Sequence, residues 1–148
     1  TFAFTDRNSK TYTNKIDLTR IAMASGKLAV NGTTPVTLPL TGTPPDSANL
    51  NLELNNQMVI VSSGPGDMAE AYYDKLKNSI IVLPTAWNKA PNGTVAIDLE
   101  VRNSIPTQQG TQLGGDISFS YDTRPLSATL AKAKPPVKKA SASTTGGK

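Results

Sequence analysis

The chain has 148 residues, a formal net charge of +4 at pH 7, and neither cysteine nor histidine. Its length suits a single domain. The two missing residue types exclude disulfides, thiol nucleophiles, the usual zinc ligands and a Ser-His-Asp arrangement. Catalysis by a Ser–Lys or carboxylate pair stays open but is disfavoured, so the sequence predicts a binding or structural protein without a cofactor, not an enzyme.

The N-terminal third of the chain contains an ambiguous stretch, residues 15–27, in which the apolar residues fit neither the helical nor the strand period cleanly. Its first half looks more like a strand. Further along, several segments alternate apolar and polar residues with period two, which predicts strands with one buried face. Two continuously apolar runs predict strands that are covered on both faces. The alternating segments are 36–40, 50–54, 95–101 and 117–121, and the continuous runs are 58–61 and 80–83.

Asn-Gly pairs stand at 31–32 and 92–93, and Pro65-Gly66 suits a type II turn. Both Asn-Gly pairs are followed by threonine, so they also match the acceptor pattern for N-glycosylation. Because Asn-Gly favours the positive φ angles of tight β-hairpin turns, the hairpin interpretation is preferred.

One helix is predicted over residues 67–77. Asp67 can cap its N-terminus, and Glu70 follows three residues later as the partner in a capping box. Met68, Ala71, Tyr72 and Leu76 would form its apolar stripe.

Two regions are candidate contact surfaces. Residues 104–115 are poor in apolar residues and predict a long exposed loop, in which Gln108 and Gln109 are candidate interaction residues. Trp87 is either an exposed interface anchor or, as a lone tryptophan in a small domain more often is, part of the core.

Two further patterns have ordinary structural explanations. Asp98 and Glu100 share one face of a predicted strand, as a glycosidase pair or cation site would, but simple solvent exposure of that face explains them better. The segment 62–67 runs from a predicted strand into the predicted helix and can hold an anion in principle, although an ordinary turn and helix cap is the preferred interpretation.

The charge is unevenly distributed. Residues 1–131 carry ten basic and eleven acidic residues, and the remaining five basic residues are all lysines of the C-terminal segment. We therefore divide the chain into a β-rich body, residues 1–130, and a basic tail, residues 131–148. Pro135-Pro136 and the Ser, Thr and Gly residues after it predict an extended or disordered arm. Candidate interaction residues in the tail are Lys132, Lys134, Lys138 and Lys139.

The predicted fold is all-β, an antiparallel sandwich or barrel with one short helix, and the alternative is an α+β sheet. The predicted function is that of a self-assembling virion protein, a capsid, coat or capsid-decorating subunit. Its C-terminal arm is expected to contact neighbouring subunits, with nucleic acid as a possible second partner. The alternatives are an extracellular fimbrial or adhesion domain and a small nucleic-acid-binding domain. No apolar run reaches about 18 residues, so no membrane insertion is expected.

Overall fold

The computed structural model describes residues 1–15, 20–24, 26–46, 48–66, 68–110 and 115–132. These residues form thirteen strands and one four-residue helix, which confirms the predicted all-β class. Two sheets make up the body. The first has the order β3 (Ala22–Met23), β5 (Val36–Thr41), β10 (Ser79–Val82), β9 (Ala71–Asp74) and β8 (Val61–Ser62).

The second sheet has the order β4 (Leu28–Val30), β13 (Leu126–Leu130), β11 (Gly93–Pro106), β6 (Asn49–Leu54) and β7 (Gln57–Val59), and β12 (Asp116–Asp122) also pairs with β11. Most neighbouring strands are antiparallel, but β4 runs parallel to β13 and β8 runs parallel to β9. A separate two-stranded sheet consists of β1 (Phe2–Thr5) and β2 (Thr11–Asn14).

The core lies between the two large sheets. Every second residue of β11 from Val95 to Val101 is buried, and so are the matching residues of β5 and, in β6, Leu52 and Leu54, while Leu50 is half-buried. This is the alternation that the sequence predicts for residues 36–40, 50–54 and 95–101, and burial of each such side chain contributes about 1.5–3 kcal/mol. Strand β10 is buried on both faces, as its continuous apolar run predicts. The core side chains are Ile21, Met23, Val30, Val36, Leu38, Leu40, Leu52, Leu54, Val59, Ala71, Ile80, Val82, Ala86, Trp87, Ala90, Val95, Ile97, Leu99, Val101, Ala128 and Leu130.

The other apolar run, residues 58–61, does not form one strand covered on both faces. It is divided between β7 and β8, and the side chains of Met58 and Ile60 are exposed whereas Val59 is buried. The backbone N–H groups of Glu70 and Ala71 both donate to the carbonyl of Ile60, so this residue marks the crossing between the two sheets. Hydrophobicity alone cannot reveal such a crossing.

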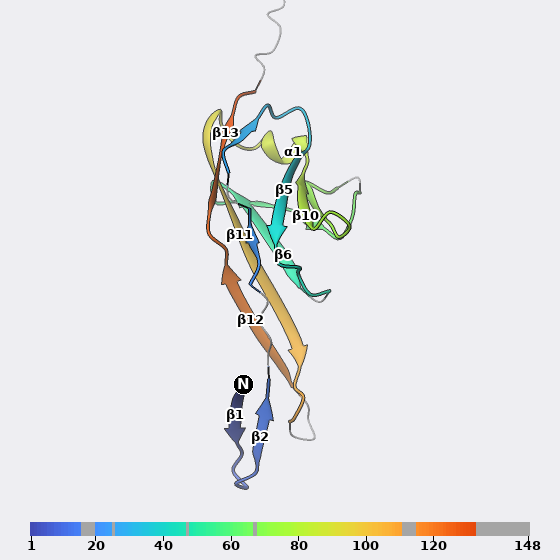
Figure 1. Ribbon diagram of the computed structural model, residues 1–148, viewed down its shortest axis with the longest axis vertical. Coiled ribbons are helices and arrows are strands. Elements are labelled where there is room, and N and C mark those ends of the chain that lie inside the picture. Colours follow the sequence, from blue (N-terminus) through green and yellow to red (C-terminus); the bar gives the residue numbers. More distant parts are fainter. Residues whose placement is uncertain (16–19, 25, 47, 67, 111–114, 133–148) are drawn as a thin grey trace, which may run out of the picture.

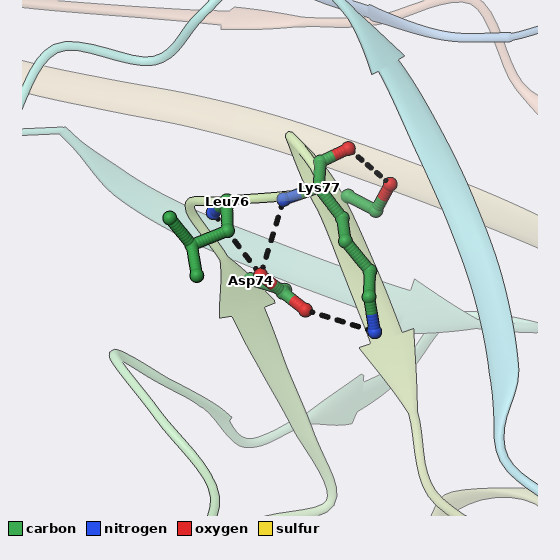
Figure 2. Close-up of polar contacts among 4 residues, drawn as sticks. Asp74, Leu76 and Lys77 are labelled. Atoms are coloured by element: carbon green, nitrogen blue, oxygen red, sulfur yellow. Dashed lines mark hydrogen bonds and ion pairs between the residues drawn. The ribbon is translucent and has the colours of Figure 1, made fainter.

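The predicted helix over residues 67–77 is wrong. Residues 71–74 form β9, and a turn then joins β9 to β10. Figure 2 shows the side chain that makes this turn: Asp74 Oδ1 accepts hydrogen bonds from the backbone N–H of Leu76 and Lys77, both at 3.1 Å, and its other oxygen lies 3.3 Å from Lys77 Nζ. The N–H of Lys77 is the main cause that lowers the pKa of Asp74.

Two of the residues expected in the apolar stripe of that helix face solvent instead, with Met68 84% and Leu76 98% exposed. Asp67, the expected cap, lies outside the described residues. The one short helix is α1 (Pro84–Trp87), where a proline occupies the first position and supplies the preset φ angle. None of the described residues belongs to a helix with the length and apolar character needed to cross a membrane.

The two Asn-Gly pairs do take positive φ at glycine, but neither forms a two-residue hairpin. Asn31 lies between β4 in one sheet and β5 in the other, and its Oδ1 accepts from the N–H groups of Thr33 and Thr34. Asn92 follows α1, and its side chain accepts from the backbone N–H of Lys132. The Asn31 side chain thus stabilises its own turn, whereas the Asn92 side chain binds a segment distant in sequence, and both Asn-Gly pairs join elements that do not pair with each other.

Strand β11 continues past the sandwich. Its ladder with β6 ends at Arg102, whereas its ladder with β12 continues to the pair Pro106–Asp116. Figure 1 shows this β11–β12 pair running away from the packed sheets toward β1 and β2, which lie at the far end of the molecule. Residues 104–106 and 116–118 therefore belong to strands, and the expected loop at 104–115 is shorter than predicted.

Glu70 connects two parts of the body. Its carboxylate accepts from the backbone N–H of Ile60 at 3.0 Å and pairs with Lys89 Nζ at 2.5 Å, and Lys89 follows α1. The hydrogen bond from Lys89, together with the N–H of Ile60, holds the pKa of Glu70 below its ordinary value of 4.5. A carboxyl group whose pKa is lowered by folding stabilises the folded state above its unfolded pKa, and this contribution is lost as the pH falls through the folded pKa.

We expect Glu70→Gln to lower the free energy of unfolding at pH 7 by about 1–2 kcal/mol, because two charge-assisted hydrogen bonds are weakened. Urea denaturation of both proteins at pH 7 and below pH 4 measures the effect, and the difference should shrink at the lower pH. Glu53→Gln, on the outer face of the second sheet, is the matched control. An equal loss in both variants, or one independent of pH, would contradict this role for Glu70.

Candidate interaction surface

The far end of the molecule is joined to the β11–β12 pair by side-chain hydrogen bonds. Gln109 Oε1 accepts from the backbone N–H of Thr13 at 2.8 Å, and Gln108 Oε1 accepts from the N–H of Lys15 at 3.1 Å. Gln108 Nε2 donates in return to the carbonyl of Lys15 at 3.0 Å. The two glutamines thus meet the backbone of β2 with amide groups of their own, as a neighbouring strand would.

Asn14 completes this contact from the opposite side. Its Nδ2 donates to the carbonyl of Gln109 at 2.9 Å, and its Oδ1 accepts from the N–H of Gln109 at 3.0 Å. The side chain is fully buried although it lies in a two-stranded sheet. Leaving such a buried amide without partners costs about 1–3 kcal/mol, so the pairing is specific. We call this set, residues 13–15 and 108–109, the clasp.

The β1–β2 hairpin has its own local structure. Asp6 Oδ1 accepts from the N–H groups of Asn8 and Lys10, which forms the turn, and Ser9 takes a positive φ. The Lys10 N–H is the largest cause of the lowered pKa of Asp6. The rings of Phe4 and Tyr12 stack with centroids 4.9 Å apart. The hairpin therefore presents β2 in a preformed shape to the clasp.

An apolar strip lies on the projecting end. In the β11–β12 ladder, Ile105 stands opposite Ile117 and Asn103 stands opposite Phe119. The predicted alternation of residues 117–121 is present, and all three of its apolar side chains are half-buried. Tyr121 still packs against the core, whereas Ile117 and Phe119 lie where β11 no longer pairs with β6. Phe4 is 40% exposed. In addition, β12 pairs with β11 along one edge, and its other edge pairs with no strand among the described residues.

The predicted interaction residues fall into three groups. Gln108 and Gln109 do make contacts, but with the N-terminal hairpin of the same chain. Trp87 is fully buried in the core, so the hypothesis of an exposed Trp anchor is wrong. Its indole N–H is buried and has no hydrogen-bond partner among the residues that the structure describes.

Lys132 is part of the body and does not belong to a free tail. Its Nζ donates to the carbonyls of Asn88 and Ala90, which lie just after α1, and its backbone N–H donates to Asn92. A lysine at the C-terminal end of a helix satisfies carbonyls that lack intrahelical partners. Lys134, Lys138 and Lys139 lie outside the described residues.

Asp98 and Glu100 lie on the outer face of the second sheet, as predicted. Glu53 stands directly opposite Asp98, and Asp122 stands directly opposite Glu100. These residues line a shallow groove of about 380 Å³. Within the described part of the chain, no three acidic side chains lie close enough to hold one metal ion. The hydrogen bond from Arg102 is the largest cause of the lowered pKa of Glu100, so this carboxylate already has a partner within the chain.

Another hollow, of about 460 Å³, opens between β6 and the β8–β9 side of the first sheet. Its rim carries the exposed ion pair Lys75–Asp46 at 2.7 Å, and Tyr73 lies in its wall. The Tyr73 hydroxyl donates to Asn78 Oδ1 at 2.8 Å, so its hydrogen bond is used within the turn. The segment 62–67, considered for anion binding, does not lead into a helix, which removes the geometric reason for that site.

The comparisons with known proteins identify no family. No protein-family model matches the chain, and no curated protein sequence is similar to it. Among solved structures, it is similar to SGBP-B of the Bacteroides ovatus mixed-linkage glucan utilization locus, solved in complex with a mixed-linkage heptasaccharide. The identity is 16% and the TM-score 0.40, over 81% of this chain and 26% of that chain. This chain thus spans about a quarter of that protein, and a similarity at this level says nothing about what it binds.

We expect Asn14→Ala to loosen the β1–β2 hairpin, because the clasp loses two hydrogen bonds and leaves the backbone of Gln109 unpaired. Hydrogen exchange of residues 11–15 and 108–109, followed by mass spectrometry, should accelerate roughly 10- to 100-fold. The matched control is Asn8→Ala, an exposed residue of the same hairpin. Equal exchange rates in the two variants would show that the clasp does not hold the hairpin.

Proposed function

We propose that this chain is a structural subunit that assembles with copies of itself or with other shell subunits, as a component or decoration of a virion shell. One observation carries the proposal: the projecting end combines an edge of β12 that pairs with no other described strand with a half-exposed apolar strip, next to a preformed hairpin. An open edge offers unpaired backbone groups to another chain, and natural proteins usually blunt such edges unless they use them.

The chemistry of the projecting end supports assembly better than catalysis. Many of its polar groups are amides and hydroxyls that bond to one another, such as Ser104 with Ser118 and Thr5 with Thr11, and the carboxylate of Asp6 is used by the hairpin turn. Polar pairs of this kind give a contact surface its register without supplying a nucleophile or a base. The alternative of an extracellular fimbrial or adhesion domain rests on the same open edge, since strand addition builds such assemblies.

The nucleic-acid alternative depends on the C-terminal lysines. Lys132 contributes little to it because its ammonium group already donates to two backbone carbonyls. Lys134, Lys138 and Lys139 stay candidates, from their sequence, for contact with a neighbouring subunit or with phosphate groups. Because their electrostatic contacts are screened by salt, an assembly that depends on them should weaken as salt is added.

The proposal is tested by a pair of neighbouring substitutions on β12. Ile117→Lys places a charge in the apolar strip, and Ser118→Lys places the same charge on the opposite face of the same strand. We expect light scattering at rising protein concentration to show oligomers for the wild type and for Ser118→Lys, and a monomer for Ile117→Lys. Trp87 fluorescence confirms that each variant keeps its core. A wild-type chain that stays monomeric alone and with candidate shells would overturn the proposal.

A further inference from the structure

The clasp makes the N-terminal hairpin a separable part of the fold. Strands β1 and β2 pair with each other and with no third strand of the described chain. In the described part of the chain, hydrogen bonds between residues 13–15 and 108–109 join the hairpin to the tip of the β11–β12 pair, and five of them involve the side chains of Asn14, Gln108 and Gln109. The docking surface and the segment that fills it are thus both visible in one chain.

We propose that, in the assembled state, the hairpin of one copy closes the clasp on Gln108 and Gln109 of a second copy. The inference rests on the proposed function and deepens it, because it names the contact by which copies are linked. A second copy supplies the same Thr13, Asn14 and Lys15, so the exchanged clasp contains the same five hydrogen bonds and requires no new surface. Exchange of an identical element is a low-cost route to oligomers for this reason.

The balance between the closed and exchanged forms depends on concentration. Within one chain the hairpin is held near its own tip by the covalent connection, which acts as a high effective concentration. At higher protein concentration, and especially where the apolar strip and the β12 edge also bring copies together, the exchanged clasp competes. Mutual exchange gives a closed dimer, whereas one-way exchange gives a ring or an open chain of subunits.

The buried Asn14 makes an unclasped hairpin costly, so a released hairpin has to find a second tip. Its side chain needs both the N–H and the carbonyl of residue 109, and solvent-exposed residues of the hairpin offer no substitute for that pair. A tip without a hairpin likewise leaves the backbone of Gln109 unpaired. A hairpin that makes all the hydrogen bonds of the clasp with a second tip is therefore favoured over one that makes only some of them.

Because the chain contains no cysteine, an engineered pair can trap the clasp. Two hydrogen bonds join the Asn14 side chain to the backbone of Gln109, so cysteines at these two positions lie on opposite sides of the clasp, and the Gln108–Lys15 hydrogen bonds remain in the double variant. We expect oxidation of Asn14→Cys/Gln109→Cys, at concentrations where light scattering shows oligomers, to give covalent dimers and larger chains on non-reducing electrophoresis. Thr94→Cys/Thr129→Cys, opposite each other in the β11–β13 ladder, should give only covalent monomers.

Covalent monomers from both pairs, in a protein that does form oligomers, would overturn the exchange and leave the proposed assembly standing. A protein that never forms oligomers would overturn both. Covalent chains from the Asn14/Gln109 pair alone support both.

A mixing experiment tests the same inference without cysteines. Asn14→Ala keeps an intact tip, and Gln108→Ala/Gln109→Ala keeps an intact hairpin, so a complete clasp can form only between the two variants. Each variant alone loses the same hydrogen bonds from its closed and its exchanged form, so its assembly should stay close to that of the wild type. An equal mixture, with one variant isotope-labelled, should assemble more strongly than either variant and give mixed oligomers in native mass spectrometry, because the complete clasp forms only between the two variants. A mixture that behaves as the sum of its components would contradict the exchange.

Discussion

The structure depends on one long strand, β11, which is packed in the core along its first part and projects from the sandwich along its last part. From Val95 to Val101, alternate side chains of β11 are buried in the core, with β6 on one edge and β13 or β12 on the other. From Asn103 to Pro106 the same strand has left the sandwich and, among the described strands, pairs only with β12. Because the backbone ladder continues without a break, the packed core fixes the position of a tip that lies well outside it.

An irregularity between β12 and β13 allows this part of the chain to follow the edge of β11 from the projecting end to the core. Strand β12 ends opposite Glu100 and β13 begins opposite Ile97. The three residues between β12 and β13, residues 123–125, therefore face only two residues of β11, residues 98–99. This is the count of a β-bulge, and the Thr123 N–H still donates to the carbonyl of Leu99 within it. The bulge restores the inward direction of Leu126, Ala128 and Leu130 after the outward Asp122, so β12 and β13 follow the same edge of β11, one at the projecting end and the other at the core.

The sandwich was largely predictable from the sequence, because period-two burial is a local signal that β5, β6 and β11 follow closely. The Asp67 to Lys77 segment was not, since Asp74 bonds to the two N–H groups of a turn and thereby stops a helix that its apolar spacing allows. The clasp was only partly predictable. Gln108 and Gln109 were predicted to contact another subunit, whereas their partners within this chain are Lys15 and Asn14, more than ninety residues away in sequence, and no local pattern reports such a pairing.

The most direct test of the account compares hydrogen exchange in the wild-type chain at a dilute, monomeric concentration and at one where it is assembled. If copies meet at the projecting end, the amides of β12, residues 116–122, should exchange more slowly in the assembled sample, while β10 in the core should be unchanged. Slower exchange confined to other sheet edges, such as β3 or β8, would contradict the account and place the contact between copies elsewhere.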